Sequence, residues 1–176
     1  MALRVRGKSR MRSVLQARGY VAGILKSIFN GRPATILIAE PDGVRWRHAY
    51  RALSQNYRIV HAATIEEAVR AGARHKPEID LLLTEARLPD GTGWDLTGLL
   101  KLDYPDVGVV YLSSAVDGEI RAHTRRDVLV EWKSPFNADR LRQAISDVLE
   151  AKRKARQAAK SSTGLPPLSR LLRWVP

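Results

Sequence analysis

Five short apolar runs alternate with helix-like stretches in the central part of the chain, and this alternation limits the folds open to it. The runs occupy residues 35–39, 57–62, 81–84, 107–112 and 128–130. Consecutive apolar positions are typical of strands covered on both faces, and strands that alternate with helices form parallel sheets. The sequence therefore predicts an α/β fold built on a doubly wound, five-stranded parallel sheet.

Local signals place helices between these runs. Helices are expected over residues 44–53, 64–74, 94–102 and 119–125, and from residue 137 to about residue 159. Thr64 is followed three residues later by Glu67, which is the pattern of a capping box. Asn137 is expected to cap the last helix, which ends before a segment rich in Ser, Gly and Pro. Residues 88–93 are dense in turn residues and are predicted to form a loop.

The net charge of +12 is concentrated at the two ends of the chain. Residues 1–33 hold 8 basic and no acidic residues, and residues 151–176 hold 7 basic and no acidic residues. Residues 34–150 hold 15 basic and 18 acidic residues. We therefore expect a basic amphipathic N-terminal extension, a mildly acidic domain, and a basic continuation of the last helix with a tail. Attraction to phosphate or to anionic lipid belongs to the two extensions.

Several classes of protein are not expected. No apolar run has the length of a membrane span. The chain has no cysteine, which excludes disulfide frameworks, thiolate metal sites and cysteine nucleophiles, and which fits a reducing, cytoplasmic compartment. No spacing of His, Asp and Ser indicates a hydrolase, so enzymatic activity is not expected.

The residues that follow the predicted strands lie at the end where ligands bind in sheets of this kind, and most of them are polar. They are Glu40, Pro41 and Asp42 after the first strand, Thr84 and Glu85 after the third, Ser113 after the fourth, and Lys133 after the fifth. Because the carboxyl ends of parallel strands meet at one edge of the sheet, these residues are the candidate site.

This series resembles the receiver domain of response regulators in bacterial two-component signalling, over essentially all of residues 34–150. Glu85 stands where the family usually has an Asp, with Pro89 four residues later and Gly93 eight residues later. Ser113 matches the hydroxyl residue of the switch, and the four residues from Lys133 to Phe136 approximate the family's Lys-Pro-Phe signature. The resemblance implies a flavodoxin-like fold with strand order 2-1-3-4-5. It also implies, in active members, a phosphoryl group on Asp beside Mg²⁺ held by neighbouring carboxylates.

The chain departs from the family at the two chemical positions. Pro41 has no side-chain oxygen, so the acidic pair that would hold Mg²⁺ is interrupted and at most weak binding is expected through Glu40 and Asp42. Glu85 projects its carboxylate one methylene farther than Asp, which disturbs the geometry of an in-line displacement. We expect an atypical pseudo-receiver that needs no cofactor. Glu85 is then either a product of drift or a mimic of the phosphorylated residue that pairs with Lys133.

The expected function is a phosphorylation-independent protein-interaction module in a phosphorelay, with a histidine kinase or a downstream effector as its partner. The basic flanks can also contact an anionic membrane or nucleic acid, and a homodimer is open as well. Two alternatives remain at this point. One is a nucleic-acid-binding regulator that uses the basic flanks, and the other is a receiver that can still be phosphorylated.

Overall fold

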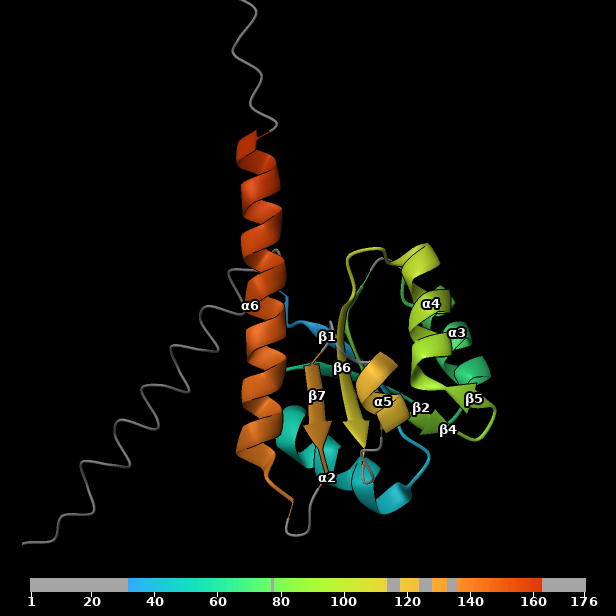
Figure 1. The fold of residues 1–176 in the computed structure, drawn as a ribbon. Helices are drawn as coiled ribbons and strands as arrows, with labels where there is room; N and C mark the ends of the chain where they lie inside the picture. The colour runs from blue at the N-terminus through green and yellow to red at the C-terminus, as the bar shows by residue number, and fades with distance from the viewer. Residues whose placement is uncertain (1–31, 77, 114–117, 124–127, 133–135, 163–176) are drawn as a thin grey trace, which may run out of the picture.

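The computed structural model describes residues 32–162 apart from residue 77 and the segments 114–117, 124–127 and 133–135. Its centre is a five-stranded sheet in the order β2-β1-β3-β6-β7, in which all neighbours are parallel (Figure 1). The strands are β1 (Thr35–Ala39), β2 (Arg58–Ala62), β3 (Ile79–Glu85), β6 (Gly108–Ser113) and β7 (Val128–Glu131). Counted along the chain, these strands have the predicted order 2-1-3-4-5, which is confirmed.

Helices cover both faces of this sheet (Figure 1). They are α2 (Gly43–Leu53), α3 (Ile65–Arg74), α4 (Gly93–Asp103), α5 (Gly118–His123) and α6 (Ala138–Ser162). The core cluster that includes residues of α2 and α6 contains Ile36 and Ile38 of β1, whereas the cluster that includes residues of α3 and α4 contains Leu37. Neighbouring side chains of one strand thus enter two different cores, and this explains why the apolar runs of the sequence are continuous.

The central strand β3 begins at Ile79, two residues before its predicted start. The added residue Asp80 is polar, yet it is buried in the strand. Its Oδ2 atom accepts a hydrogen bond from the Thr35 N–H at 2.9 Å, so the buried carboxylate is satisfied. Runs of apolar residues do not reveal such a buried polar residue. The sequence shows that Asp80 is polar but not that the fold supplies it with a hydrogen-bond partner.

The predicted cap of α3 forms in part. The Thr64 hydroxyl oxygen accepts from the Glu67 N–H at 3.1 Å, as the pattern predicts. The Glu67 carboxylate accepts from the Ala63 N–H at 2.7 Å, one residue before the position that a capping box uses. The predicted loop after β3 contains a short antiparallel hairpin of β4 (Arg87–Leu88) and β5 (Gly91–Thr92).

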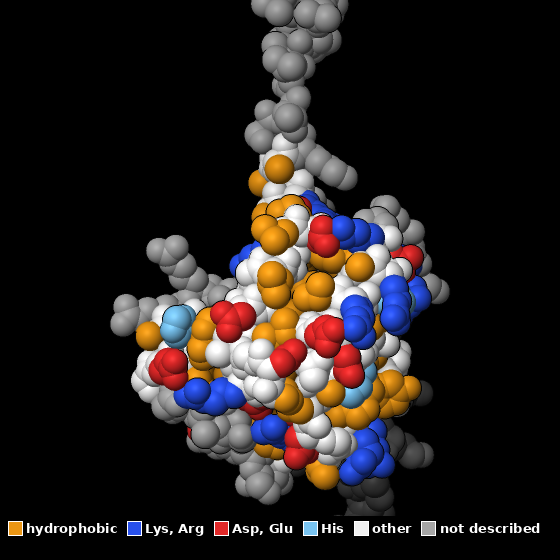
Figure 2. Space-filling model, turned by 90° about the vertical axis from the view of Figure 1, so that its right-hand side faces the viewer, with side chains coloured by type: hydrophobic (Ala, Val, Ile, Leu, Met, Phe, Trp, Pro, Cys, Tyr) orange, Lys and Arg blue, Asp and Glu red, His pale blue; other side chains and the backbone are white. Residues whose placement is uncertain are grey.

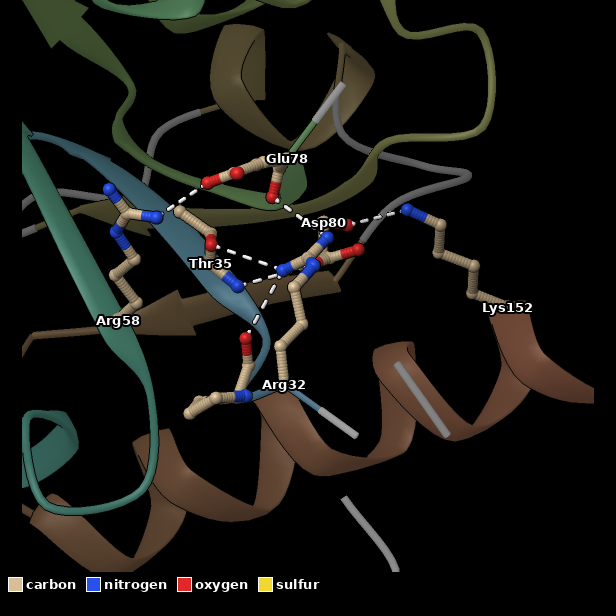
Figure 3. A network of polar contacts seen from close by, with 7 residues as sticks. Arg32, Thr35, Arg58, Glu78, Asp80 and Lys152 are labelled. Atoms are coloured by element: carbon tan, nitrogen blue, oxygen red, sulfur yellow. Dashed lines mark hydrogen bonds and ion pairs between the residues drawn. The ribbon is translucent and has the colours of Figure 1, made fainter. Parts of the chain in front are cut away.

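A polar network around Asp80 closes the end of the sheet where the strands begin (Figure 3). Arg32 Nη1 lies 2.9 Å from Asp80 Oδ2, and Lys152 Nζ donates to the Asp80 carbonyl oxygen at 2.8 Å. Burial lowers the pKa of Lys152 to about 8. Arg32 and Lys152 lie just outside the predicted domain limits of residues 34 and 150, and the division into three parts stays a prediction.

The side of the molecule on which α3 and α4 lie carries charges of both signs, with hydrophobic side chains among them (Figure 2). The exposed large hydrophobic residues of these two helices are Val69, Leu99 and Leu102, of which Leu102 is 82% exposed. Within the described part of the chain, no helix combines the length and the apolar character that crossing a membrane requires.

Candidate functional site

Three of the predicted site residues meet at the carboxyl end of the sheet. Glu40 follows β1 and is 1% exposed, Glu85 ends β3, and Ser113 ends β6. All three are buried, and the Ser113 side chain makes a hydrogen bond to Glu85. The strands β1, β3 and β6 are neighbours in the sheet, so parallel pairing places their last residues at one edge. The predicted switch residue Lys133 lies outside the described residues.

Arg45 joins the two buried carboxylates. Its Nη1 atom lies 3.0 Å from Glu85 Oε2, and its Nη2 atom lies 3.1 Å from Glu40 Oε1. Its Nε also donates to Glu40 Oε1 at 3.2 Å. Arg45 is in the first turn of α2, and helical side chains tilt towards the N-terminus of their helix, so its guanidinium returns over the strand ends. Arg45 was not among the site residues predicted from the sequence, although a basic residue three positions after a cap residue is a signal that points to it.

Asp42 forms the cap of α2. Its Oδ1 atom accepts from the N–H groups of Val44 and Arg45, both at 2.8 Å, and these hydrogen bonds lower the pKa of Asp42. The Asp42 N–H in turn donates to Glu40 Oε1 at 2.8 Å. Asp42 therefore fixes the start of the helix that carries Arg45, and one of its oxygens is committed to that task.

The two buried carboxylates share a single guanidinium, and this sets their protonation. Burial raises the pKa of Glu40 to about 7, against the lowering effects of the Asp42 N–H and of Arg45. Burial also raises the pKa of Glu85, which Arg45 and the Ala86 N–H lower in part. Among the described residues, Glu40 Oε2 and Glu85 Oε2 have no hydrogen-bond partner, and Glu85 Oε2 forms an ion pair with Arg45. Near neutral pH the site therefore holds a proton on Glu40 in a large fraction of molecules.

The residues of this site do not fit the Mg²⁺ that the resemblance implies. Mg²⁺ needs near-octahedral oxygen coordination, and Pro41 provides no side-chain oxygen. The Arg45 guanidinium already lies between the carboxylates of Glu40 and Glu85, where it would repel a divalent cation. Among the residues that the structure describes, no group of three or more His, Asp or Glu side chains is arranged to hold a metal ion.

Gly93 shows why the spacing of eight residues after Glu85 is kept. A Cβ atom at Gly93 would lie 2.5 Å from the carbonyl oxygen of Glu85, a distance that packed atoms do not reach. The Gly93 N–H also donates to the Ala86 carbonyl at 3.0 Å. The first residue of α4 thus rests directly on the end of β3, and only glycine allows this approach.

Trp132, the aromatic residue next to the predicted lysine, belongs to a different cluster. Its ring stacks on Phe136 with the centroids 4.0 Å apart, and the His48 ring meets both edge-on. Only its backbone reaches the site, where the Trp132 N–H donates to the Ser113 carbonyl at 2.7 Å. The hydroxyl of Ser113 and the ring of Trp132 are therefore directed to different partners.

Sequence comparison relates part of the chain to regulatory proteins of Vibrio species. No protein-family model matches the chain. The regulatory protein LuxO of Vibrio vulnificus (strain YJ016) is 32% identical over 87 residues, which are 47% of this chain and 18% of LuxO. LuxO of Vibrio cholerae serotype O1 is 33% identical over 90 residues, 49% of this chain and 19% of LuxO. The similarity thus spans less than a fifth of the length of these relatives.

Solved structures of receiver domains share the fold of the described residues. The signal receiver domain of an HD domain-containing protein from Pseudomonas fluorescens Pf-5 has a TM-score of 0.62 and 22% identity, over 70% of this chain and 99% of that one. The signal receiver domain of a putative LuxO repressor protein from Vibrio parahaemolyticus has a TM-score of 0.61 and 20% identity, over 72% and 98%. The described residues thus have the fold of CheY-like receiver domains of response regulators, and about half of the chain is similar in sequence to LuxO.

Proposed function

We propose that this domain is a pseudo-receiver, a protein-interaction module of two-component signalling that works without taking up a phosphoryl group. The observation that carries the proposal is the position of Arg45, whose guanidinium lies 3.0 Å from Glu85 and 3.1 Å from Glu40. The Arg45 guanidinium, which is part of the chain, lies where an exchangeable Mg²⁺ would have to bind. The domain then has no enzymatic activity and no cofactor of its own.

The contacts of Glu85 support the same proposal. Phosphoryl transfer to a carboxylate requires an oxygen that can approach the phosphorus in line, with cations placed on the charge that develops. Glu85 Oε1 accepts from the Ala86 N–H at 2.9 Å, and Glu85 Oε2 faces Arg45. Both oxygens are thus directed to groups of the protein. The sequence predicts that Glu85, as a mimic of the phosphorylated residue, pairs with Lys133. Arg45 is a second candidate for the fixed cation in this pair.

If the site keeps one conformation, the surface that a partner recognises keeps one conformation as well. The ion pair between Arg45 and Glu85 links α2 to β3, so it holds the site in one arrangement instead of two. We therefore expect a histidine kinase or a downstream effector to bind this domain constitutively, in the cytoplasm. The same unchanging surface would also suit a second copy of this chain. Sedimentation of the full chain distinguishes a homodimer from a monomer that binds another protein.

Phosphate uptake from a small phosphodonor with Mg²⁺ tests the proposal, with intact-protein mass as the measurement. We expect no uptake by the natural chain, by Glu85→Asp, or by Glu85→Asp combined with Pro41→Asp, because Arg45 still occupies the site in all three. Adding Arg45→Met to the double variant should permit uptake. The matched control adds Arg47→Met instead, which removes an exposed arginine of the same helix and should leave uptake absent.

Two results would contradict this account. Stoichiometric uptake by the natural chain, mapped to Glu85, would show a receiver that can still be phosphorylated. Uptake by the variant with Pro41→Asp and Glu85→Asp while Arg45 is intact would show that the guanidinium moves aside. In that case Pro41 and Glu85 alone, and not Arg45, would account for inactivity.

A further inference from the structure

The last helix extends well past the domain that it packs on. α6 has 25 residues and is therefore about 37 Å long. Leu141, Ile145 and Leu149, spaced four residues apart, are buried against the sheet. Beyond them the C-terminal turns of α6 project away from the rest of the domain (Figure 1).

The inward face of α6 changes from apolar to basic where it leaves the domain. Lys152, Arg153 and Arg156 follow Leu149 by three, four and seven residues, so they continue the face that Leu149 belongs to. Lys154 adds a further charge on the neighbouring face. A helix that continued an apolar stripe would need a partner to cover it, whereas this one offers a row of cations.

These cations differ in how they are held. Lys152 Nζ is bound to the Asp80 carbonyl at 2.8 Å and anchors the helix to the sheet (Figure 3). Arg156 lies 3.8 Å from Asp106, which is a loose pair at an exposed position. Arg153 and Lys154 make no ion pair with any residue that the structure describes. The basic face is thus fixed in place at Lys152 and available for a ligand beyond it.

The composition of the projecting turns selects among the partners of a cationic helix. The uncharged residues between 151 and 159 are four alanines and one glutamine. A helix that lies in a membrane surface needs large apolar side chains on one face, and a coiled coil needs an apolar seam. Both are missing from these described turns. A face of Lys and Arg without such apolar side chains instead suits a phosphate backbone, to which proteins bind through these cations.

The described chain begins at the same end of the sheet as the projecting turns of α6. Arg32 and Lys152 both bind Asp80, so the chain enters the domain beside the point where α6 leaves it (Figure 3). Residues 1–31 carry seven basic and no acidic residues. Among the described residues, Arg32 and the basic turns of α6 therefore bring positive charge to one end of the sheet, the end opposite Glu85.

We propose that the projecting basic face of α6, formed by Arg153, Lys154 and Arg156, binds the phosphate backbone of double-stranded nucleic acid. Phosphate contacts of this kind carry no base specificity, so the surface would give affinity and orientation and leave sequence recognition to other parts of the assembly. This surface is separate from the site formed by Glu40, Arg45 and Glu85. The result of the phosphorylation experiment therefore does not affect the proposal.

The test measures binding of the full chain to a fluorescently labelled DNA duplex by anisotropy over a series of salt concentrations. The test variant replaces Arg153, Lys154 and Arg156 by Gln. The control variant replaces three exposed arginines away from the projecting turns by Gln, namely Arg47, Arg51 and Arg140. Both variants lose the same net charge, and the substituted side chains of both are exposed or half-buried, so circular dichroism should show both to be folded.

We expect the slope of log affinity against log salt to become shallower by about 2–3 in the test variant, since each lost phosphate contact contributes about 0.9. Affinity should fall at least about tenfold at low salt, while the control variant keeps the natural slope. Equal losses of affinity and slope in both variants would show that net charge alone causes the effect, and would overturn the proposal. Absence of duplex binding, or binding to phosphatidylserine vesicles without binding to the duplex, would overturn it as well.

Discussion

At the scale of single residues, the site is defined by a mismatch between two buried carboxylates and one guanidinium. Arg45 can balance one negative charge, and Glu40 and Glu85 would together carry two. Burying an uncompensated carboxylate is unfavourable. Protonation of one carboxylate removes the second charge at the lowest cost in free energy. This explains why burial raises the pKa of Glu40 to about 7.

The protonation of Glu40 makes the stability of the domain depend on pH. The pKa of Glu40 is about 7 in the folded chain against an ordinary value of 4.5. Between these values the folded chain keeps a proton that the unfolded chain has released, so the free energy of unfolding falls as pH rises through this window. The loss amounts to about 3 kcal/mol in total and is complete above the folded pKa.

Glu40→Gln should remove this contribution. Urea unfolding at pH 5, 6, 7 and 8 is the measurement, and the variant should gain stability relative to the natural chain as pH rises. Titrating groups outside the site affect both proteins alike, so the difference between them reports on Glu40 together with Glu85, to which it is coupled. Parallel pH profiles would show that Glu40 is already ionised at pH 5.

At the scale of elements, the loop from β3 to α4 is held from three sides. The Ala86 N–H donates to the Leu112 carbonyl, and the Ala86 carbonyl accepts from the Gly93 N–H. At the tip of the hairpin, Gly91 has a φ of 152°, a conformation that other residues rarely adopt. The Asp90 carboxylate accepts from the first two N–H groups of α3, which lowers the pKa of Asp90. The loop therefore positions α3 and α4 together.

Gly93→Ala should separate α4 from β3. The new Cβ would meet the Glu85 carbonyl at 2.5 Å, and the contacting atom is backbone that cannot move alone. We expect a loss of about 1–3 kcal/mol in the free energy of unfolding. Gly98→Ala is the matched control in the same helix, because nothing lies within 4 Å of its Cβ position. It should stabilise the chain by up to about 1 kcal/mol, and equal effects of the two substitutions would refute the steric argument.

At the scale of the whole molecule, the two ends of the sheet have different tasks. The carboxyl end carries Glu40 after β1, Arg45 of α2 and Glu85 of β3. The opposite end carries Asp80, which binds Arg32 from the start of the described chain and Lys152 from its last helix. The second network ties both flanks to the centre of the sheet, although it plays no part in the candidate site.

Shortened chains measure what the network around Asp80 contributes. A chain of residues 32–162 should unfold as cooperatively as the full chain. A chain of residues 34–150 should remain cooperative but lose about 1–3 kcal/mol, because Asp80 loses charged partners while it stays buried. A chain of residues 32–150 recovers Arg32 alone and separates the two contributions. Equal urea midpoints for all three would show that Arg32 and Lys152 add nothing to stability.

The sequence by itself determined the class and order of the sheet. Continuous apolar runs that alternate with helical segments have few solutions other than a doubly wound sheet, and the structure has the predicted strand order. Glu40, Glu85 and Ser113 lie near one another for the same reason, since each stands at the carboxyl end of a neighbouring parallel strand. Such inferences succeed because periodicity and parallel pairing are properties of the local chain and of one sheet.

Only the tertiary structure decided what these residues contact. Arg45 reaches Glu85, 40 positions away, because α2 packs with its first turn over the strand ends, and no local pattern encodes that direction. Asp80 likewise meets Arg32 from 48 positions away and Lys152 from 72. Ion pairs and hydrogen bonds of this kind depend on distances in space between segments that are far apart in sequence. Their partners are therefore fixed by the packing of the whole domain.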